Sequence, residues 1–219
     1  MAKLTKKGGS KTRRVVLDAA LELVAEKGLQ ALTHRGIESR ANVSHGVTTY
    51  YFKNREALIE ALIEHICDRQ IEWIEALYAQ LRAVGSERAG DGAASDYTRK
   101  ALDLILANRS LTLAGFETYL HAARHPHVRE IAARARQRHV EIQAELFRFI
   151  GARDPEQAAL MMLSATEGLI FYQFSVPVEN FEDDAVKFLT MLASALRDYG
   201  PNPIDSERTA PPAPPEGDD

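Results

Sequence analysis

The sequence predicts an all-α protein, with a three-helix N-terminal part followed by a longer helical part. Apolar residues recur at the helical spacing i, i+3, i+4 and i+7 through most of the 219 residues. No run alternates apolar and polar residues with the period of two that a half-buried strand requires. Two short helical segments near the N-terminus are joined by roughly three residues, the spacing of a helix-turn-helix.

The composition is that of an ordinary globular chain. Hydrophobic residues make up 45% and charged residues 26% of the sequence, so a wholly disordered chain is excluded. Cys67 is the single cysteine. It cannot form an internal disulfide, which indicates a reducing, cytoplasmic compartment. The longest apolar stretch, residues 160–176, contains Glu167 and is too short for a membrane span.

Charge is distributed unevenly along the chain. The formal net charge is −4, yet residues 1–60 contain 11 lysines and arginines against 6 aspartates and glutamates. A basic N-terminal part on an acidic remainder indicates that the N-terminal part meets a polyanion. The alternative is a solvated basic tail without a partner.

The elements follow in order from start and stop signals. Residues 1–10 are expected to be a flexible basic arm, and the first helix is expected over 11–27, with Gly28 in a left-handed conformation after it. Residues 11–55 form the predicted helix-turn-helix domain, and residues 56–200 the predicted helical remainder. Residues 201–219 are expected to be a disordered, acidic, proline-rich tail.

Two short helices make the predicted helix-turn-helix. Thr33 is expected to cap the first, which ends near Ala41, and Asn42 suits the tight turn because asparagine tolerates the left-handed conformation. Ser44 is expected to cap the second, over residues 45–52. By spacing alone, any surface helical hairpin would fit equally well.

The remaining helices are expected from periodicity and breakers. His125-Pro126 separates two helices because proline disfavours a helical residue before it. Asp154 starts another, with proline next and Gln157 at the third position. The expected ranges are 55–82, 96–108, 110–124, 127–150, 154–174 and 180–199, with a polar loop over 83–95.

The segment 32–62 resembles the N-terminal domain of TetR-type (tetracycline-repressor-type) regulators. The preceding helix that ends in AEKG, residues 25–28, fits the pattern as well. The matching positions are Thr33, Ile37, Ala41, Val43-Ser44, Tyr50-Tyr51-Phe52, Lys53 and Arg55. The resemblance implies a dimeric, sequence-specific DNA-binding regulator, most simply a repressor released from a near-palindromic operator by a small-molecule effector.

The resemblance also implies which residues meet DNA. The second short helix enters the major groove and the first crosses the phosphate backbone. A basic arm formed by Lys6, Lys7, Lys11, Arg13 and Arg14 is expected to follow a phosphate or minor-groove edge. The expected DNA-binding residues are Thr33, His34, Ser44, His45, Gly46, Val47, Thr49, Tyr50, Tyr51, Lys53 and Arg55.

Two positions depart from the family pattern. Thr48 stands where a packing leucine is usual, so its contact with Val43 should be weaker, and Thr49 stands where an aromatic residue is usual. The base preference of relatives therefore does not transfer to this chain. Tyr50 and Phe52 also have a structural interpretation, in which both rings belong to the core.

For residues 56–200 the resemblance implies a ligand-binding and dimerisation domain. The last two helices, about 154–199, are expected to pair with those of a second copy, with close approach at Ala158, Ala159, Met162, Ala165, Leu169 and Ala193. An apolar or amphiphilic effector is expected, although most of the candidate lining residues have an alternative assignment as core side chains. The candidate lining residues are Trp73, Phe116, Glu117, Tyr119, Leu120, Tyr172 and Gln173.

Other chemistries are weakly indicated. His121 and His125 have a spacing compatible with a metal, and His127 follows, but nothing completes a site, and neither a metal nor a cofactor is expected. Enzyme motifs such as a phosphate loop or a nucleophile elbow are lacking. Two alternatives stay open: an interaction module with non-specific polyanion binding, and an enzyme built on the ligand domain.

Overall fold

The computed structural model describes residues 6–85 and 93–200. Within these ranges every regular element is a helix, so the predicted all-α class is confirmed for the described part. The predicted tail, residues 201–219, lies outside the described residues. The first half of the predicted arm and most of the predicted loop at 83–95 lie outside them too.

The N-terminal part, called the head below, holds four helical elements. They are α1 Lys6–Lys27, the 3₁₀ turn η1 Leu29–Ala31, α2 His34–Ala41 and α3 Val47–Tyr51. Helix α1 begins five residues earlier than predicted, since residues 6–10 of the expected arm continue it. Lys11, Arg13 and Arg14 therefore lie on a helix, and Arg14 lies 3.6 Å from Glu72 of the long helix Arg55–Gly85.

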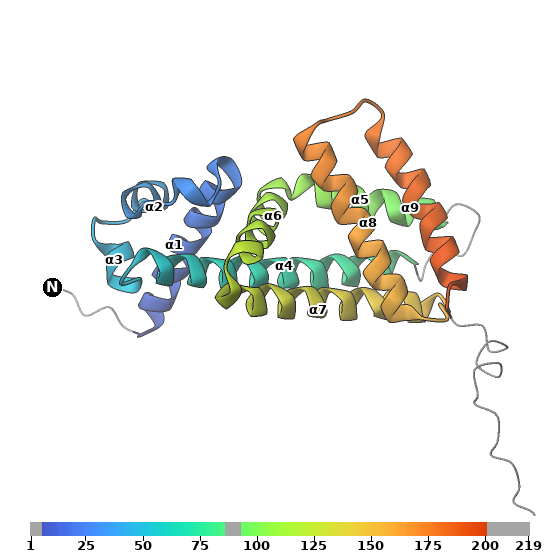
Figure 1. The fold of residues 1–219 in the computed structure, drawn as a ribbon, viewed down its shortest axis with the longest axis horizontal. Coiled ribbons are helices and arrows are strands. Elements are labelled where there is room, and N and C mark those ends of the chain that lie inside the picture. Colours follow the sequence, from blue (N-terminus) through green and yellow to red (C-terminus); the bar gives the residue numbers. More distant parts are fainter. Residues whose placement is uncertain (1–5, 86–92, 201–219) are drawn as a thin grey trace, which may run out of the picture.

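The second part is built around one long helix that runs along most of the molecule (Figure 1). Figure 1 shows the head at one end of this helix, α4, and the α8–α9 pair toward the other, with α7 alongside. The bounds are α4 Arg55–Gly85, α5 Ala93–Ala107, α6 Arg109–Arg124, α7 Pro126–Phe149, α8 Pro155–Ser175 and α9 Phe181–Asp198. No helix among the described residues is long and apolar enough to cross a membrane.

The predicted helix signals act as expected at two sites. The Asp154 carboxylate accepts the N–H of Gln157 at 3.1 Å, and Pro155 is the first residue of α8. His125 ends α6 in an extended conformation and Pro126 begins α7. Gly28, between α1 and η1, has a positive φ of +73°, but its ψ of 169° lies outside the left-handed helical region that was predicted.

The head has no separate core. Leu58, Leu62 and Ile66 of α4 are fully buried and pack with the apolar face of α1, and Leu111 and Ala114 of α6 join the same cluster. The predicted boundary at residue 55 is therefore no structural break. Helices α4 and α6 therefore both contribute to the core of the head.

Most of the residues predicted for a dimer interface face inward instead, whereas Ala165 is half-buried and belongs to no core cluster. Ala158 and Ala159 are fully buried, and Met162 nearly so, in a cluster that joins α7, α8 and α9 of the same chain. Leu169 and Ala193 pack against that cluster. The large exposed apolar residues of these two helices lie elsewhere on their surfaces, at Leu160, Met161, Phe171, Tyr172, Phe188 and Met191.

Candidate nucleic-acid interface and ligand cavity

The turn between α2 and α3 uses two residues with positive φ. Asn42 is left-handed at φ +50°, as predicted, and its N–H bonds back to the end of α2. Gly46, at φ +88°, precedes α3 and replaces Ser44, which was predicted as its cap. Nothing lies within 4 Å of where a Cβ on Gly46 would be, so the backbone at the start of α3 is open to an approaching partner.

A buried carboxylate holds the start of α3, and sequence reasoning missed it. Glu38 of α2 is 4% exposed. Its Oε1 accepts the N–H groups of Gly46 and Thr48, each at 3.0 Å, and the Thr48 hydroxyl at 2.7 Å. A helix N-terminus leaves such N–H groups without intrahelical partners, so Glu38 supplies the cap that Ser44 was expected to provide.

Thr48 is the partner that makes this burial tolerable. Its side chain is fully buried, and its hydroxyl bond is the main reason why the pKa of Glu38 is lowered, against the opposing effect of burial. His45 contributes a further contact from Nδ1 to Glu38 Oε2 at 3.1 Å. The departure from the family leucine at position 48 therefore replaces an apolar contact by a polar one inside the head.

Most of the predicted DNA-binding residues are exposed. Tyr50 is 74% exposed, so its alternative assignment to the core is wrong, whereas Phe52 is 3% exposed and belongs to the core. The His45 side chain is 92% exposed. Thr33 is exposed and also caps α2, accepting the Gly36 N–H at 3.1 Å. Of the others, Ser44, Thr49 and Lys53 are exposed, and His34, Gly46, Val47 and Tyr51 are half-buried.

Arg55 has a structural task that was not predicted. Its guanidinium donates to the carbonyl oxygens of Leu32, at 2.6 Å, and Leu29, at 3.0 Å. These bonds tie the first residue of α4 to the connection between α1 and α2. Two of its nitrogens are thus engaged, and the phosphate contact expected of Arg55 has no support in this geometry.

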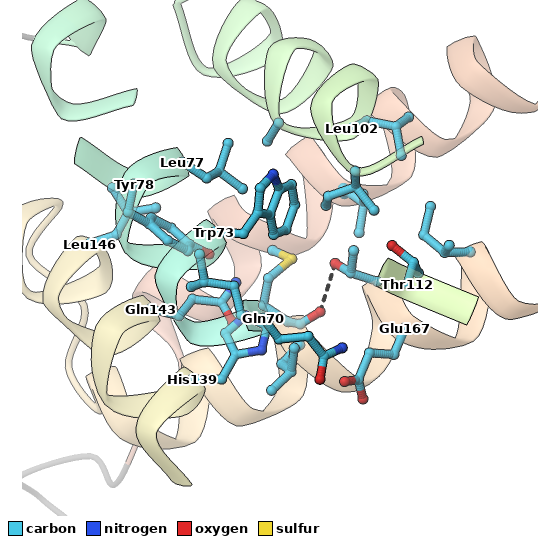
Figure 2. Close-up of a pocket in the computed structure, with 18 of the residues that line it drawn as sticks. Gln70, Trp73, Leu77, Tyr78, Leu102, Thr112, His139, Gln143, Leu146 and Glu167 are labelled. Carbon is cyan, nitrogen blue, oxygen red and sulfur yellow. Dashed lines mark hydrogen bonds between the residues drawn. The ribbon is translucent and has the colours of Figure 1, made fainter. Parts of the chain in front are cut away.

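A cavity of about 510 Å³ lies between α4, α5, α6, α7 and α8 (Figure 2). Its size is within the range of small-molecule sites. Trp73, the one tryptophan of the chain, lines it together with Phe116 and Tyr119. Figure 2 shows Trp73, Leu77 and Leu102 across the cavity from Gln70, His139 and Glu167. The cavity therefore has an apolar side and a polar side.

The polar side contains an ion-paired carboxylate. Glu167 Oε2 accepts Arg136 Nη1 at 3.0 Å, and Tyr119 Oη lies 3.4 Å from Oε1. Burial raises the pKa of Glu167, while Arg136 acts in the opposite direction. Burial likewise lowers the pKa of His139 to about 4, with Arg136 adding to the effect. The imidazole of His139 is therefore neutral near pH 7.

Comparison with protein families matches both parts of the chain. Residues 16–62 match the model of bacterial regulatory proteins of the tetR family. Residues 89–198, half of the chain, match the model of the tetracyclin repressor-like C-terminal domain. The chain belongs to the TetR family of transcriptional regulators.

Individual relatives agree with this family. The HTH-type transcriptional regulator YvkB of Bacillus subtilis is 38% identical over 79 residues, 34% of this chain and 42% of that protein. HTH-type transcriptional regulator BetI of Burkholderia thailandensis is 33% identical over 95 residues, 43% of this chain and 42% of that protein. The match thus spans about two fifths of the length of these relatives.

A solved structure extends the match to the whole fold. A TetR-family transcriptional regulator from a Rhodococcus species has a TM-score of 0.61 and 25% sequence identity to this chain. The alignment covers 86% of this chain and all of that one. Both the head and the α4–α9 part of this TetR-family chain therefore have counterparts in a known structure.

Some of the predicted lining residues line the cavity, and the others lie elsewhere. Trp73, Phe116 and Tyr119 line the cavity. Glu117 and Leu120 instead line a smaller hollow beside α1, and the Glu117 carboxylate accepts the Leu29 N–H at 3.4 Å. Tyr172 is 70% exposed and lines neither space, and Gln173 accepts the Val178 N–H at 3.0 Å after α8. Helical spacing does not show which face of α6 or α8 points inward.

Sequence reasoning missed most of the polar lining residues. Glu167, Gln70, His139 and Gln143 were not predicted, because polar residues inside a helical bundle give no periodic signal. Gln143 is 7% exposed and its Oε1 is buried without a hydrogen-bond partner among the described residues. Gln70 lies against Gly115, where an added Cβ would come within 2.1 Å of its amide nitrogen.

The remaining candidates carry no further chemistry. The rings of His121 and His125 stack with centroids 3.8 Å apart, and within the described part of the chain no group of three or more potential ligands could hold a metal ion. Cys67 is buried, and burial raises the pKa of its thiol to about 11. A thiol with that pKa is protonated near neutral pH and is a poor nucleophile.

Proposed function

We propose that this chain is a dimeric transcriptional repressor that reads a near-palindromic DNA operator and is released by a small molecule bound in the cavity. The exposed start of α3, held by Glu38 and opened by Gly46, is the observation that carries the reading role. Family membership supports it. Such a regulator would act in the cytoplasm, where its operator lies.

In this proposal the N-terminal end of α3 enters the major groove. His45, Val47 and Thr49 lie nearest the base edges, where an imidazole hydrogen-bonds and methyl groups meet a thymine methyl. Thr33, Tyr50, Tyr51 and Lys53 contact phosphates and fix the register without reading sequence.

One chain presents one reading helix, so reading two half-sites requires a second copy. The apolar side chains that α8 and α9 leave exposed, including Leu160 and Met191, are the surface we propose for pairing. Both helices are thus apolar on the side facing their own core and on a second side, as expected of helices buried in a dimer.

Release by an effector requires that the ligand bind two states of the protein with different affinity. The cavity is lined by α4 and α6, and both helices enter the core of the head. Two further links cross the same junction, from Glu117 to the Leu29 N–H and from Arg55 to the Leu29 carbonyl. A ligand that shifts α6 against α4 would therefore reorient the head.

In-vitro selection from a random DNA pool, with affinity measured at two salt concentrations, tests the proposal. We expect a near-palindromic consensus and a change in base preference for His45→Ala and Val47→Ala. Unselective, strongly salt-dependent binding would instead favour a general polyanion contact. An unchanged consensus in both variants would remove α3 from the reading role.

A further inference from the structure

The polar side of the cavity offers a specific hydrogen-bonding surface. The Glu167 carboxylate lines the cavity, while Arg136 and Ser164, which complete its ion-pair cluster, are not among the lining residues. The guanidinium that pairs with Glu167 therefore belongs to a residue outside the lining. A molecule in the cavity meets a carboxylate whose charge is already compensated.

The hydrogen-bonding capacity of that carboxylate is only partly used. Arg136 occupies Oε2 at 3.0 Å, but the hydroxyl of Tyr119 reaches Oε1 only at 3.4 Å. A carboxylate has about four lone-pair directions. Glu167 lines the cavity, and its Oε1 lacks a short donor among the described residues.

The groups beside Glu167 argue against a charged ligand. Arg136 already pairs with the Glu167 carboxylate at 3.0 Å, so a cationic ligand would compete with this guanidinium for the carboxylate. An anion would meet the Glu167 carboxylate itself. The neutral His139 ring and the Gln70 amide, by contrast, both donate and accept hydrogen bonds. An uncharged head group that donates to Glu167 fits all three side chains.

The opposite side of the cavity determines the rest of the ligand. Trp73, Leu77, Leu102 and Phe116 provide an aromatic and aliphatic surface. Burial of apolar ligand surface against such side chains supplies most of the binding free energy, and the polar groups fix orientation.

We propose that this pocket takes an uncharged amphiphile, with an apolar ring-containing body against Trp73 and one hydroxyl-type head group that donates to Glu167 Oε1. The inference rests on the proposed function only in calling this ligand the effector. Its binding does not depend on DNA.

The test uses the full-length protein and four probes with one skeleton. They are para-substituted biphenyls: biphenylmethanol, its methyl ether, biphenylmethylammonium and biphenylcarboxylate. Trp73 is the single tryptophan and lines the cavity, so its fluorescence reports occupancy directly. We expect the alcohol to bind about tenfold more tightly than the ether, since one hydrogen bond distinguishes them. The alcohol should also bind more tightly than either ion.

Two variants locate the preference. In Glu167→Leu the alcohol and the ether should bind about equally, whereas Thr112→Val, a matched change in the lining, should keep the tenfold ratio. Thr112 is a suitable control because its hydroxyl already donates to the Asn108 carbonyl at 3.0 Å. If Glu167→Leu does not fold, the four-probe ranking on the wild-type protein still decides.

The outcomes separate this inference from the proposed function. Tightest binding of the ammonium would make Glu167 a counter-ion and would overturn the inference. Equal binding of alcohol and ether, tightest binding of the carboxylate, or no binding of any probe would overturn it too. A selected operator together with any of these results leaves the regulator standing without this ligand class. The expected ranking without a selected operator supports the ligand class alone.

Discussion

Glu38 is the residue on which the reading helix depends most directly. It accepts two backbone N–H groups and one hydroxyl from the start of α3. We expect Glu38→Ala to lower the free energy of unfolding by about 2 kcal/mol, because hydrogen bonds to a charged group are lost and buried donors stay unpaired. Urea unfolding measures this loss, and operator affinity should fall with it.

A second substitution tests whether the Glu38–Thr48 pair acts as a unit. Replacing both partners of a buried polar pair by apolar groups is often nearly neutral. The double variant Glu38→Ala with Thr48→Leu should therefore recover most of the stability that Glu38→Ala loses. The single variant Thr48→Leu is measured as well. If the double variant loses as much stability as Glu38→Ala and Thr48→Leu together, Thr48 is not the partner that makes the buried carboxylate tolerable.

His139 predicts a pH dependence of stability. Its pKa is lowered from 6.5 to about 4 in the folded protein, so between these values the unfolded chain binds a proton that the folded one does not. The contribution of the neutral His139 ring to the free energy of unfolding is fully present above pH 6.5. It is lost as the pH falls toward 4, by up to about 3 kcal/mol.

Chemical denaturation at pH 7 and pH 5 measures this effect. The wild type should lose more stability between these conditions than His139→Leu does. His127→Ala, which removes an exposed histidine, should behave as the wild type. Equal pH dependence of the wild type and His139→Leu would show that the ring is not buried as a neutral group.

At the scale of elements, α4 connects the head to the ligand cavity. Arg55 at its first turn holds the carbonyl oxygens of Leu29 and Leu32, whereas Lys53 just before it is exposed. We expect Arg55→Ala to lower stability by about 1 kcal/mol or more, with little change in the salt dependence of DNA binding. Lys53→Ala should leave stability unchanged and lower the salt slope by about one.

Thermal unfolding and operator titrations at several salt concentrations separate the structural role of Arg55 from the phosphate contact expected of Lys53. A salt slope lowered by about one in Arg55→Ala would restore its assignment as a phosphate contact. An unchanged slope in Lys53→Ala would place that lysine away from DNA.

For the whole molecule, the proposed dimer interface lies on α8 and α9. Met191 is 62% exposed on α9 and Leu160 is partly exposed on α8. We expect Met191→Asp combined with Leu160→Asp to convert a dimer into a monomer, because each change buries a charge in the apolar interface. Light scattering measures the mass, and operator affinity should fall because one head reads one half-site.

Val15→Asp serves as the matched control for the dimer test. Val15 is an exposed apolar residue on α1 of the head, 39% exposed, and it lies outside α8 and α9. This variant should stay dimeric. A double α8–α9 variant that also stays dimeric would place the interface elsewhere.

Local sequence signals were enough to predict the all-α class, the helix-turn-helix with Thr33 as cap and Asn42 as turn, and the breaks at His125-Pro126 and Asp154. These follow from local rules, because propensity, capping and proline geometry act over a few residues. The resemblance of residues 32–62 likewise rests on adjacent positions that agree in order.

The packing of the helices against one another sets which face of each helix is buried. It placed Ala158 and Ala159 in the core and brought Glu38 to the start of α3. In the folded chain Glu167 lines the cavity, whereas Glu117 lines the smaller hollow beside α1. Helical periodicity defines an apolar stripe but not its neighbour, and α8 is apolar on several sides. A buried polar group is stable only when distant partners satisfy it, so its position depends on the packing of elements far apart in the sequence.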